Sequence, residues 1–83
     1  MRVEQELREE IEKWSEKLDA ALRKLRAVDS KREKMFIENI TAYFKDARYF
    51  FEKEDLVRAF ECLIWAWAWI EIGKRLKIIE IEE

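Results

Sequence analysis

The chain contains no proline and a single glycine, Gly73, among its 83 residues. Turns and hairpins take much of their chemistry from these two residue types, which also interrupt helices. A chain almost free of both is therefore expected to be helical along nearly its whole length. Its length also predicts one domain, residues 1–83.

The first expected helix, at about residues 3–27, carries an unbroken apolar stripe. Its apolar positions alternate in steps of four and three residues, a spacing that keeps them on one face of a helix. They are Leu7, Ile11, Trp14, Leu18, Ala21, Leu25 and Val28. The opposite face is charged, so this segment is predicted to be an amphipathic helix with one side in the core.

Two short breaks separate this helix from two more, expected at about residues 31–52 and 56–77, with a short tail at residues 78–83. Ser30 and Glu33 have the spacing of a capping box at the start of the second helix. Asp55 is the expected N-cap of the third helix. Connections this short place consecutive helices antiparallel and adjacent. The predicted fold is all-α, an up-down-up antiparallel three-helix bundle.

The third expected helix is apolar on nearly every side, since residues 56–72 read LVRAFECLIWAWAWIEI. Ala59, Ala66 and Gly73 are seven residues apart and predict a core face on which neighbouring helices approach closely. The remaining apolar surface is more than one small bundle can cover. The surplus makes a candidate interface of Ile64, Trp65, Trp67 and Ile72.

Two interpretations of this surplus remain open. A partner, most simply a second copy of the chain, covers these side chains. Alternatively, the first two helices cover the flanks of the third, while the tail residues Ile78, Ile79 and Ile81 fold over the rest.

Residues 43–76, YFKDARYFFEKEDLVRAFECLIWAWAWIEIGKRL, resemble a short archaeal family called domain of unknown function 357. The resemblance rests on an aromatic helix ending near residues 47–50, a turn, and a helix that carries residues 58–60, Trp69 and Gly73. It implies a spectrin-repeat-like or albumin-binding type of three-helix bundle and an archaeal source, and it implies no activity. The chain departs from the family pattern at Glu54, where glycine is expected, and at residues 65–68, where Tyr, His and Gly are expected.

The residue types needed for most catalytic and metal sites are missing. The chain has no histidine, which is the commonest general base and metal ligand. It also lacks a glycine-rich phosphate loop and a zinc-type cysteine pair. Its only cysteine, Cys62, rules out an internal disulfide and is expected to be a small buried apolar residue. We therefore expect no catalytic residues, no cofactor, no metal and no enzymatic activity.

Basic residues are expected to gather at one end of the bundle, where the first and second helices are connected. The candidate anion contact consists of Arg23, Lys24, Arg26, Lys31, Arg32 and Lys34. Either a partner such as RNA uses this end, or nearby acids neutralise it. The net charge of −2 and the sequence pI of about 5.4 favour neutralisation.

The sequence also bears on location and source. The charged N-terminus MRVEQELREE does not resemble a signal peptide, and the uncharged run at residues 62–70 is far shorter than the roughly 20 residues that span a membrane. Few heat-labile residues and many Glu, Lys and Arg residues are typical of a thermophile. We expect a cytoplasmic, non-enzymatic interaction module that forms a homodimer through its third helix.

Overall fold

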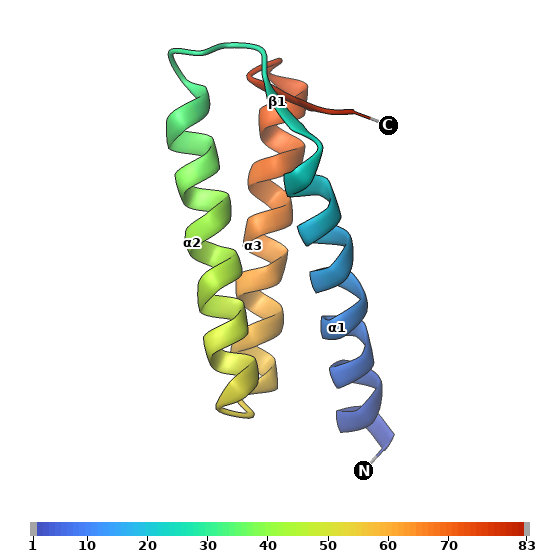
Figure 1. Cartoon of the computed structure of the whole chain (residues 1–83). Coiled ribbons are helices and arrows are strands. Elements are labelled where there is room, and N and C mark those ends of the chain that lie inside the picture. Colours follow the sequence, from blue (N-terminus) through green and yellow to red (C-terminus); the bar gives the residue numbers. More distant parts are fainter. Residues whose placement is uncertain (1, 83) are drawn as a thin grey trace.

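The computed structural model describes residues 2–82, which form an up-down-up bundle of three antiparallel helices (Figure 1). The helices are α1 (Arg2–Arg23), α2 (Glu33–Glu52) and α3 (Leu56–Arg75). Two short strands, β1 (Leu25–Ala27) and β2 (Ile79–Ile81), lie at one end. The molecule is a rod of 45 × 22 × 18 Å. The predicted all-α, spectrin-repeat-like architecture is confirmed.

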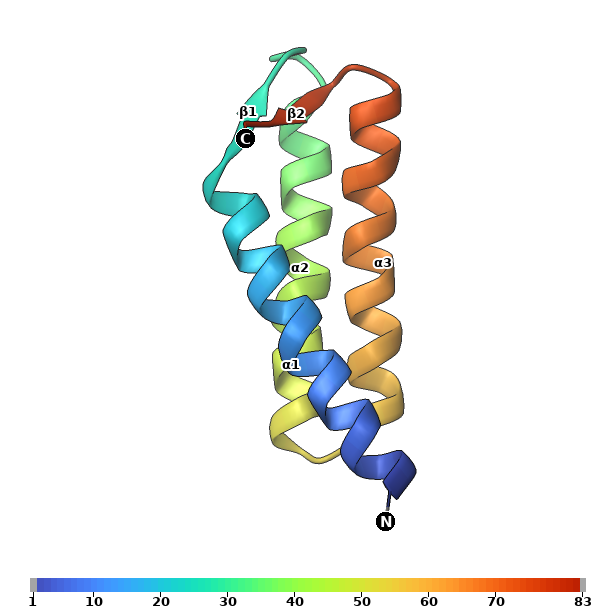
Figure 2. The ribbon, with the colours of Figure 1, turned by 90° about the vertical axis from the view of Figure 1, so that its right-hand side faces the viewer.

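The core follows the apolar spacing of the three helices. α2 and α3 lie side by side along their length, and α1 crosses them at an angle (Figure 2). The buried helix positions recur every three or four residues in α2 and α3, and at steps of seven and three in α1, as expected for one face of each helix. They are Ile11, Leu18 and Ala21 in α1, Phe36, Ile40, Phe44 and Ala47 in α2, and Leu56, Ala59, Leu63, Ala66, Ile70 and Gly73 in α3.

The predicted close-approach line of α3 is confirmed at all three positions. Ala59 and Ala66 are completely buried. At Gly73 a Cβ atom would lie 2.9 Å from Cγ1 of Ile79 and 3.0 Å from Cδ2 of Phe36. Even an alanine side chain would therefore crowd these neighbours, which accounts for the single glycine in the chain.

The end of the first helix was predicted wrongly. α1 stops at Arg23, and residues 25–27 form β1, which pairs antiparallel with β2 in the register Leu25–Ile81, Arg26–Glu80 and Ala27–Ile79. Both segments alternate apolar and charged residues, so pairing turns Leu25, Ile79 and Ile81 toward the bundle and leaves Arg26 ion-paired with Glu80 outside. Figure 2 shows this two-stranded clip across one end of the helices.

The tail is part of the core. Ile78 and Ile79 are almost completely buried, and the amides of Val28 and Asp29 donate to the Ile78 carbonyl at 2.9 and 3.1 Å. The tail therefore covers one end of the bundle, as the second of the two open interpretations expected. It does not extend over the outward side of α3, where large apolar side chains stay exposed.

The predicted capping box at Ser30 is absent, and α2 begins at Glu33 without a side-chain cap. Asp29 organises this turn instead, because its carboxylate accepts from the amides of Lys31 and Arg32 at 3.0 and 3.3 Å. Arg32 Nε also donates to this carboxylate at 2.9 Å, and the bond holds the Asp29 pKa below its usual value. A charged acceptor competes better for these amides than a serine hydroxyl does. The predicted cap of α3 is confirmed: Asp55 accepts from the Arg58 amide at 3.2 Å.

Both α2 and α3 end in a left-handed residue that is not glycine. Glu54 has φ of 61° and Lys77 has φ of 59°. The amides that follow the two helices bond back across the last turn in the Schellman pattern: Asp55 N to Phe50 O, and Ile78 N to Gly73 O, both at 2.9 Å. The glycine that the family resemblance led us to expect at Glu54 is therefore expected on conformational grounds as well.

Candidate interaction surface

The outward face of α3 carries the largest exposed apolar cluster on one helix of the described chain. Its apolar members are each about half exposed or more. They are Val57, Ile64, Trp65, Ile72 and Leu76. Ala68 lies among them and is half-buried. We call this set the α3 face.

Three of the four candidate interface residues belong to the α3 face, and Trp67 does not. The Trp67 ring is half-buried and packs edge-on against Trp14 of α1, with centroids 5.8 Å apart and an interplanar angle of 85°. Its indole Nε1 donates to the Trp14 carbonyl at 3.4 Å. Trp67 therefore holds α1 against α3, and it is not available as a fully exposed anchor.

Trp65 is held in place by a residue from α2. Its ring stacks on Tyr43 with centroids 6.1 Å apart and an interplanar angle of 19°. Trp65 remains 56% exposed on its other side. The stack fixes the indole before any partner arrives, which lowers the entropy lost on binding.

Sequence reasoning missed Tyr43 and Leu76 as parts of this surface. Neither residue was among the candidate interface residues, although Leu76 lies within the expected third helix at residues 56–77. The apolar spacing of α3 could have identified Leu76, because it lies four residues after Ile72. Tyr43 could not be identified in this way, since the stack depends on how α2 slides against α3.

Two hollows flank α1. An apolar pocket of about 200 Å³ lies between α1 and α3, beside the α3 face, and is lined by Trp14, Phe60, Leu63, Ile64 and Trp67. A second hollow of about 300 Å³ lies between α1 and α2 and is rimmed by charged groups. It is lined by Ile11, Glu12, Ser15, Glu16, Ala47, Arg48, Phe51 and Glu52. Both hollows are open to solvent, and their volumes lie at or below the lower end of the range of small-molecule sites.

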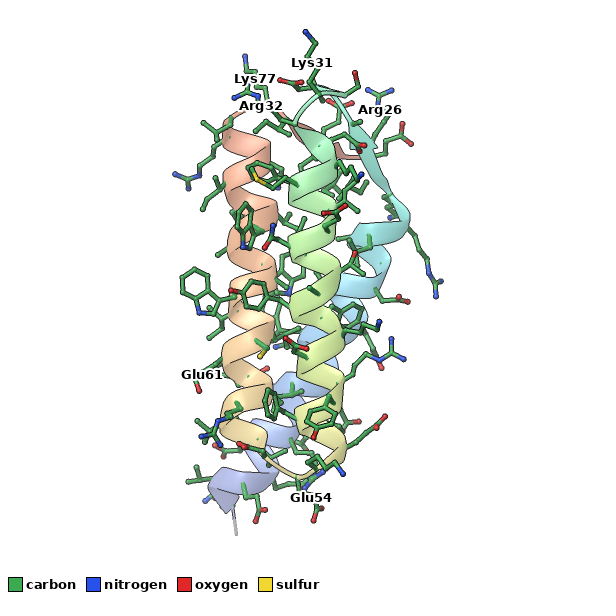
Figure 3. The ribbon with its side chains drawn as sticks, turned by 90° about the vertical axis from the view of Figure 1, so that its left-hand side faces the viewer. Arg26, Lys31, Arg32, Glu54, Glu61 and Lys77 are labelled. Atoms are coloured by element: carbon green, nitrogen blue, oxygen red, sulfur yellow. The ribbon has the colours of Figure 1, made fainter. Side chains whose placement is uncertain are left out.

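The six residues of the candidate anion contact are all exposed at the clip end of the bundle. Figure 3 shows Arg26, Lys31, Arg32 and Lys77 at this end, far from Glu54 at the other. Four of the six are ion-paired: Arg23 with Asp19 at 2.7 Å, Arg26 with Glu80 and Glu82, Arg32 with Asp29 at 2.9 Å, and Lys34 with Glu38 at 3.9 Å. Within residues 2–82, no ion pair involves Lys24 or Lys31.

The groups that could carry chemistry are few. Cys62 is half-buried, and burial raises the pKa of its thiol, with further help from the nearby carboxylates of Asp46 and Glu61. The thiol therefore stays protonated and is a poor nucleophile at neutral pH. Across residues 2–82, no group of three or more Cys, Asp or Glu side chains could hold a metal ion. None of the helices described is long and apolar enough to cross a membrane.

The fold and this surface define a small all-α protein, a three-helix bundle with one apolar helix face turned to solvent. Residues 13–79 match a family described as protein of unknown function (DUF357), and the chain belongs to that family. The structure is similar to the crystal structure of a DUF357 protein from Archaeoglobus fulgidus, with a TM-score of 0.86. The two sequences are 44% identical. The match covers 96% of this chain and 99% of the other. A comparison with curated proteins finds no match.

Proposed function

We propose that the chain is a non-enzymatic helical interaction module that forms a homodimer through the α3 face. The observation that carries this proposal is the exposure of Trp65 together with the four aliphatic side chains of the α3 face. Large apolar surfaces that a monomer leaves in water commonly serve an interaction. Burying the α3 face against a partner removes apolar surface from water, which is the main favourable contribution to the free energy of association.

The chemistry of the α3 face fits a protein partner. Tryptophan is enriched among the residues that dominate binding energy, especially near the centre of an interface and surrounded by aliphatic contacts. Trp65 lies between Ile64 and Ile72 along the helix surface and is already braced by Tyr43. A standard interface takes about 800 Å² from each partner, about an eighth of the 6205 Å² of this chain.

The non-enzymatic part of the proposal rests on residue types and their surroundings. With no histidine in the chain and with Cys62 held as a thiol, the commonest general base and the most reactive side-chain nucleophile are missing. The carboxylates of Glu10 and Glu71 are exposed and ion-paired at 3.2 and 3.6 Å, as on ordinary helix surfaces.

Size-exclusion chromatography with light scattering at micromolar concentration tests the proposal. The wild-type chain should have twice the monomer mass of 10.2 kDa. Trp65→Ser should shift it toward the monomer. Tyr49→Ser is the matched control, because Tyr49 is also 56% exposed but lies on α2, and this variant should remain a dimer. A wild-type monomer, or equal loss of the dimer in both variants, would count against the α3 face.

The alternative function is an anion or RNA contact at the clip end. Of the six candidate residues, Lys24 and Lys31 have no ion pair within the described chain, while acids neutralise the other four. This neutralisation makes the alternative the weaker proposal. A polarisation titration with mixed-sequence RNA at low salt tests it, because phosphate binding is strongest there and weakens steeply with salt. No binding at low salt would remove it.

A further inference from the structure

One line of residues along the outward side of α3 is arranged symmetrically about Ala68. Four residues before and after it are Ile64 and Ile72, and seven residues before and after it are Glu61 and Arg75. The four outer residues are exposed, and Ala68 lies half-buried at the centre. Steps of four and seven residues return to nearly the same side of a helix, so the five residues form one line along α3.

A line of this kind is complementary to itself when one copy is reversed. In a two-fold dimer the same surface lies on both sides of the axis, so that if residue i meets residue j, residue j also meets residue i. When two copies of α3 run antiparallel with the axis at Ala68, each Ile64 meets the second copy's Ile72. Each Glu61 then faces the second copy's Arg75.

We propose that two copies of the chain associate through an antiparallel pair of α3 helices whose two-fold axis passes at Ala68. This inference rests on the self-association proposed above and adds its direction and register. The Ile64–Ile72 layers form the apolar centre, and the two Glu61–Arg75 pairs close its ends. The small Ala68 side chain lets the helices approach closely where they cross.

The charges of the line about Ala68 favour the antiparallel direction. In a parallel pair, Glu61 would face Glu61 and Arg75 would face Arg75, and like charges placed opposite one another oppose association. The antiparallel pair with its axis at Ala68 converts both repulsions into attractions. The same residues therefore select the direction of the helices as well as their register.

Glu61 and Arg75 are available for such contacts. Arg58 is paired with Asp55 at 2.7 Å and Lys74 with Glu71 at 3.6 Å, whereas none of the ion pairs in the described part of the chain involves Glu61 or Arg75. Figure 3 shows Glu61 pointing away from the bundle at the edge of α3. Both side chains can therefore meet a second copy without giving up a partner inside their own chain.

The two-fold axis also brings the same flank of each α3 together. Trp65 lies on one flank of the Ala68 line, stacked on Tyr43, while Trp67 lies on the other and packs on Trp14. Because a two-fold axis perpendicular to the helices keeps each flank on its own side, both Trp65 rings fall on one side of the helix pair. There they extend the apolar centre beyond the two helices to the edges of both α2 helices.

Disulfide trapping tests the direction and the register. Glu61→Cys and Arg75→Cys are made separately in a Cys62→Ala background, and the fold of each is checked by circular dichroism. Under mild oxidation, an equimolar mixture should give a linked dimer with one chain of each kind, and neither variant alone should link efficiently. A parallel pair would instead link each variant to itself, and that result would overturn the antiparallel arrangement.

Charge reversal gives a second readout that does not use cysteine. Glu61→Arg and Arg75→Glu should each weaken dimerisation about tenfold or more, because each creates two like-charge contacts in an antiparallel dimer. The double variant should regain wild-type affinity. In a parallel dimer neither single change alters the balance of charges, so unchanged affinity in both would refute the register. A wild-type monomer would instead refute the self-association itself, so the two failures can be told apart.

Discussion

Replacing the two left-handed residues by glycine should stabilise the protein. Glu54 and Lys77 have φ of 61° and 59°, a conformation that costs an ordinary L-residue about 1–2 kcal/mol. Glycine adopts it freely but loses about 0.5–1 kcal/mol more backbone entropy on folding. The expected net gain is about 0.5–1 kcal/mol at each site. The sites cap the opposite ends of a rod 45 Å long, so the two gains should add.

The two sites should differ slightly. Glu54 also contacts Arg8, with 3.4 Å between the Arg8 Nη2 and Glu54 Oε1 atoms, and this exposed pair is worth at most about 1 kcal/mol. Within the described residues Lys77 has no ion pair to lose. Lys77→Gly should therefore stabilise more than Glu54→Gly does.

Urea and thermal unfolding followed by circular dichroism, at one fixed protein concentration, measure these changes. In a domain of this size, 1 kcal/mol corresponds to about 4–8 °C in Tm. Lys45→Gly is the control, because Lys45 is exposed in the middle of α2, where glycine should cost about 1 kcal/mol. If Lys77→Gly lowered stability as much as Lys45→Gly does, the argument from backbone conformation would be wrong.

Two further predictions concern α3. Ala66→Leu should overpack the core and lower the free energy of unfolding by about 1–3 kcal/mol, whereas Ala68→Leu should leave the fold intact and change only the concentration dependence of the melt. Equal, concentration-independent losses in both variants would show that the two sides of α3 have been confused. The pKa of Asp55 is lowered, chiefly by the hydrogen bond from the Arg58 side chain. The ionised carboxylate therefore contributes fully to the free energy of unfolding above the pKa that Asp55 has in the unfolded chain, and this contribution is lost as the pH falls below about 4. Asp55→Asn keeps a cap acceptor but cannot titrate, and its Tm should fall less than that of the wild type between pH 6 and pH 3.

The helices were predictable because each one carries its own signal. The apolar stripe of α1 and the line of Ala59, Ala66 and Gly73 are local patterns, and a helix of any orientation needs them. The N-cap at Asp55 is equally local. Such features can be recognised without knowing how the helices are arranged in space.

The pairing of β1 with β2 and the different exposure of Trp65 and Trp67 were not predictable in this way. β1 and β2 are three residues each, and they pair across more than 50 residues of sequence, so neither strand carries a signal of its own. Leu25 also fits the apolar spacing of the preceding helix, and for this reason the first helix was predicted to extend to about residue 27. Trp65 and Trp67 look alike in the sequence, and only the tilt of α1 decides that Trp67 meets Trp14 while Trp65 stays in water.

The arrangement of the helices also has a kinetic consequence. α2 and α3 are joined by the short turn at residues 53–55, so their mutual contacts close small loops, whereas the hydrogen bond from Trp67 to Trp14 joins residues 53 positions apart. The conformational entropy lost on closing a loop increases with the length of the loop, so contacts between residues close in sequence form with a smaller loss of entropy. The α2–α3 hairpin is therefore expected to make up the folding nucleus, and α1 is expected to dock after the rate-limiting step. On this view the helix that leads the sequence comes last in folding, and it controls the rate of unfolding more than the rate of folding.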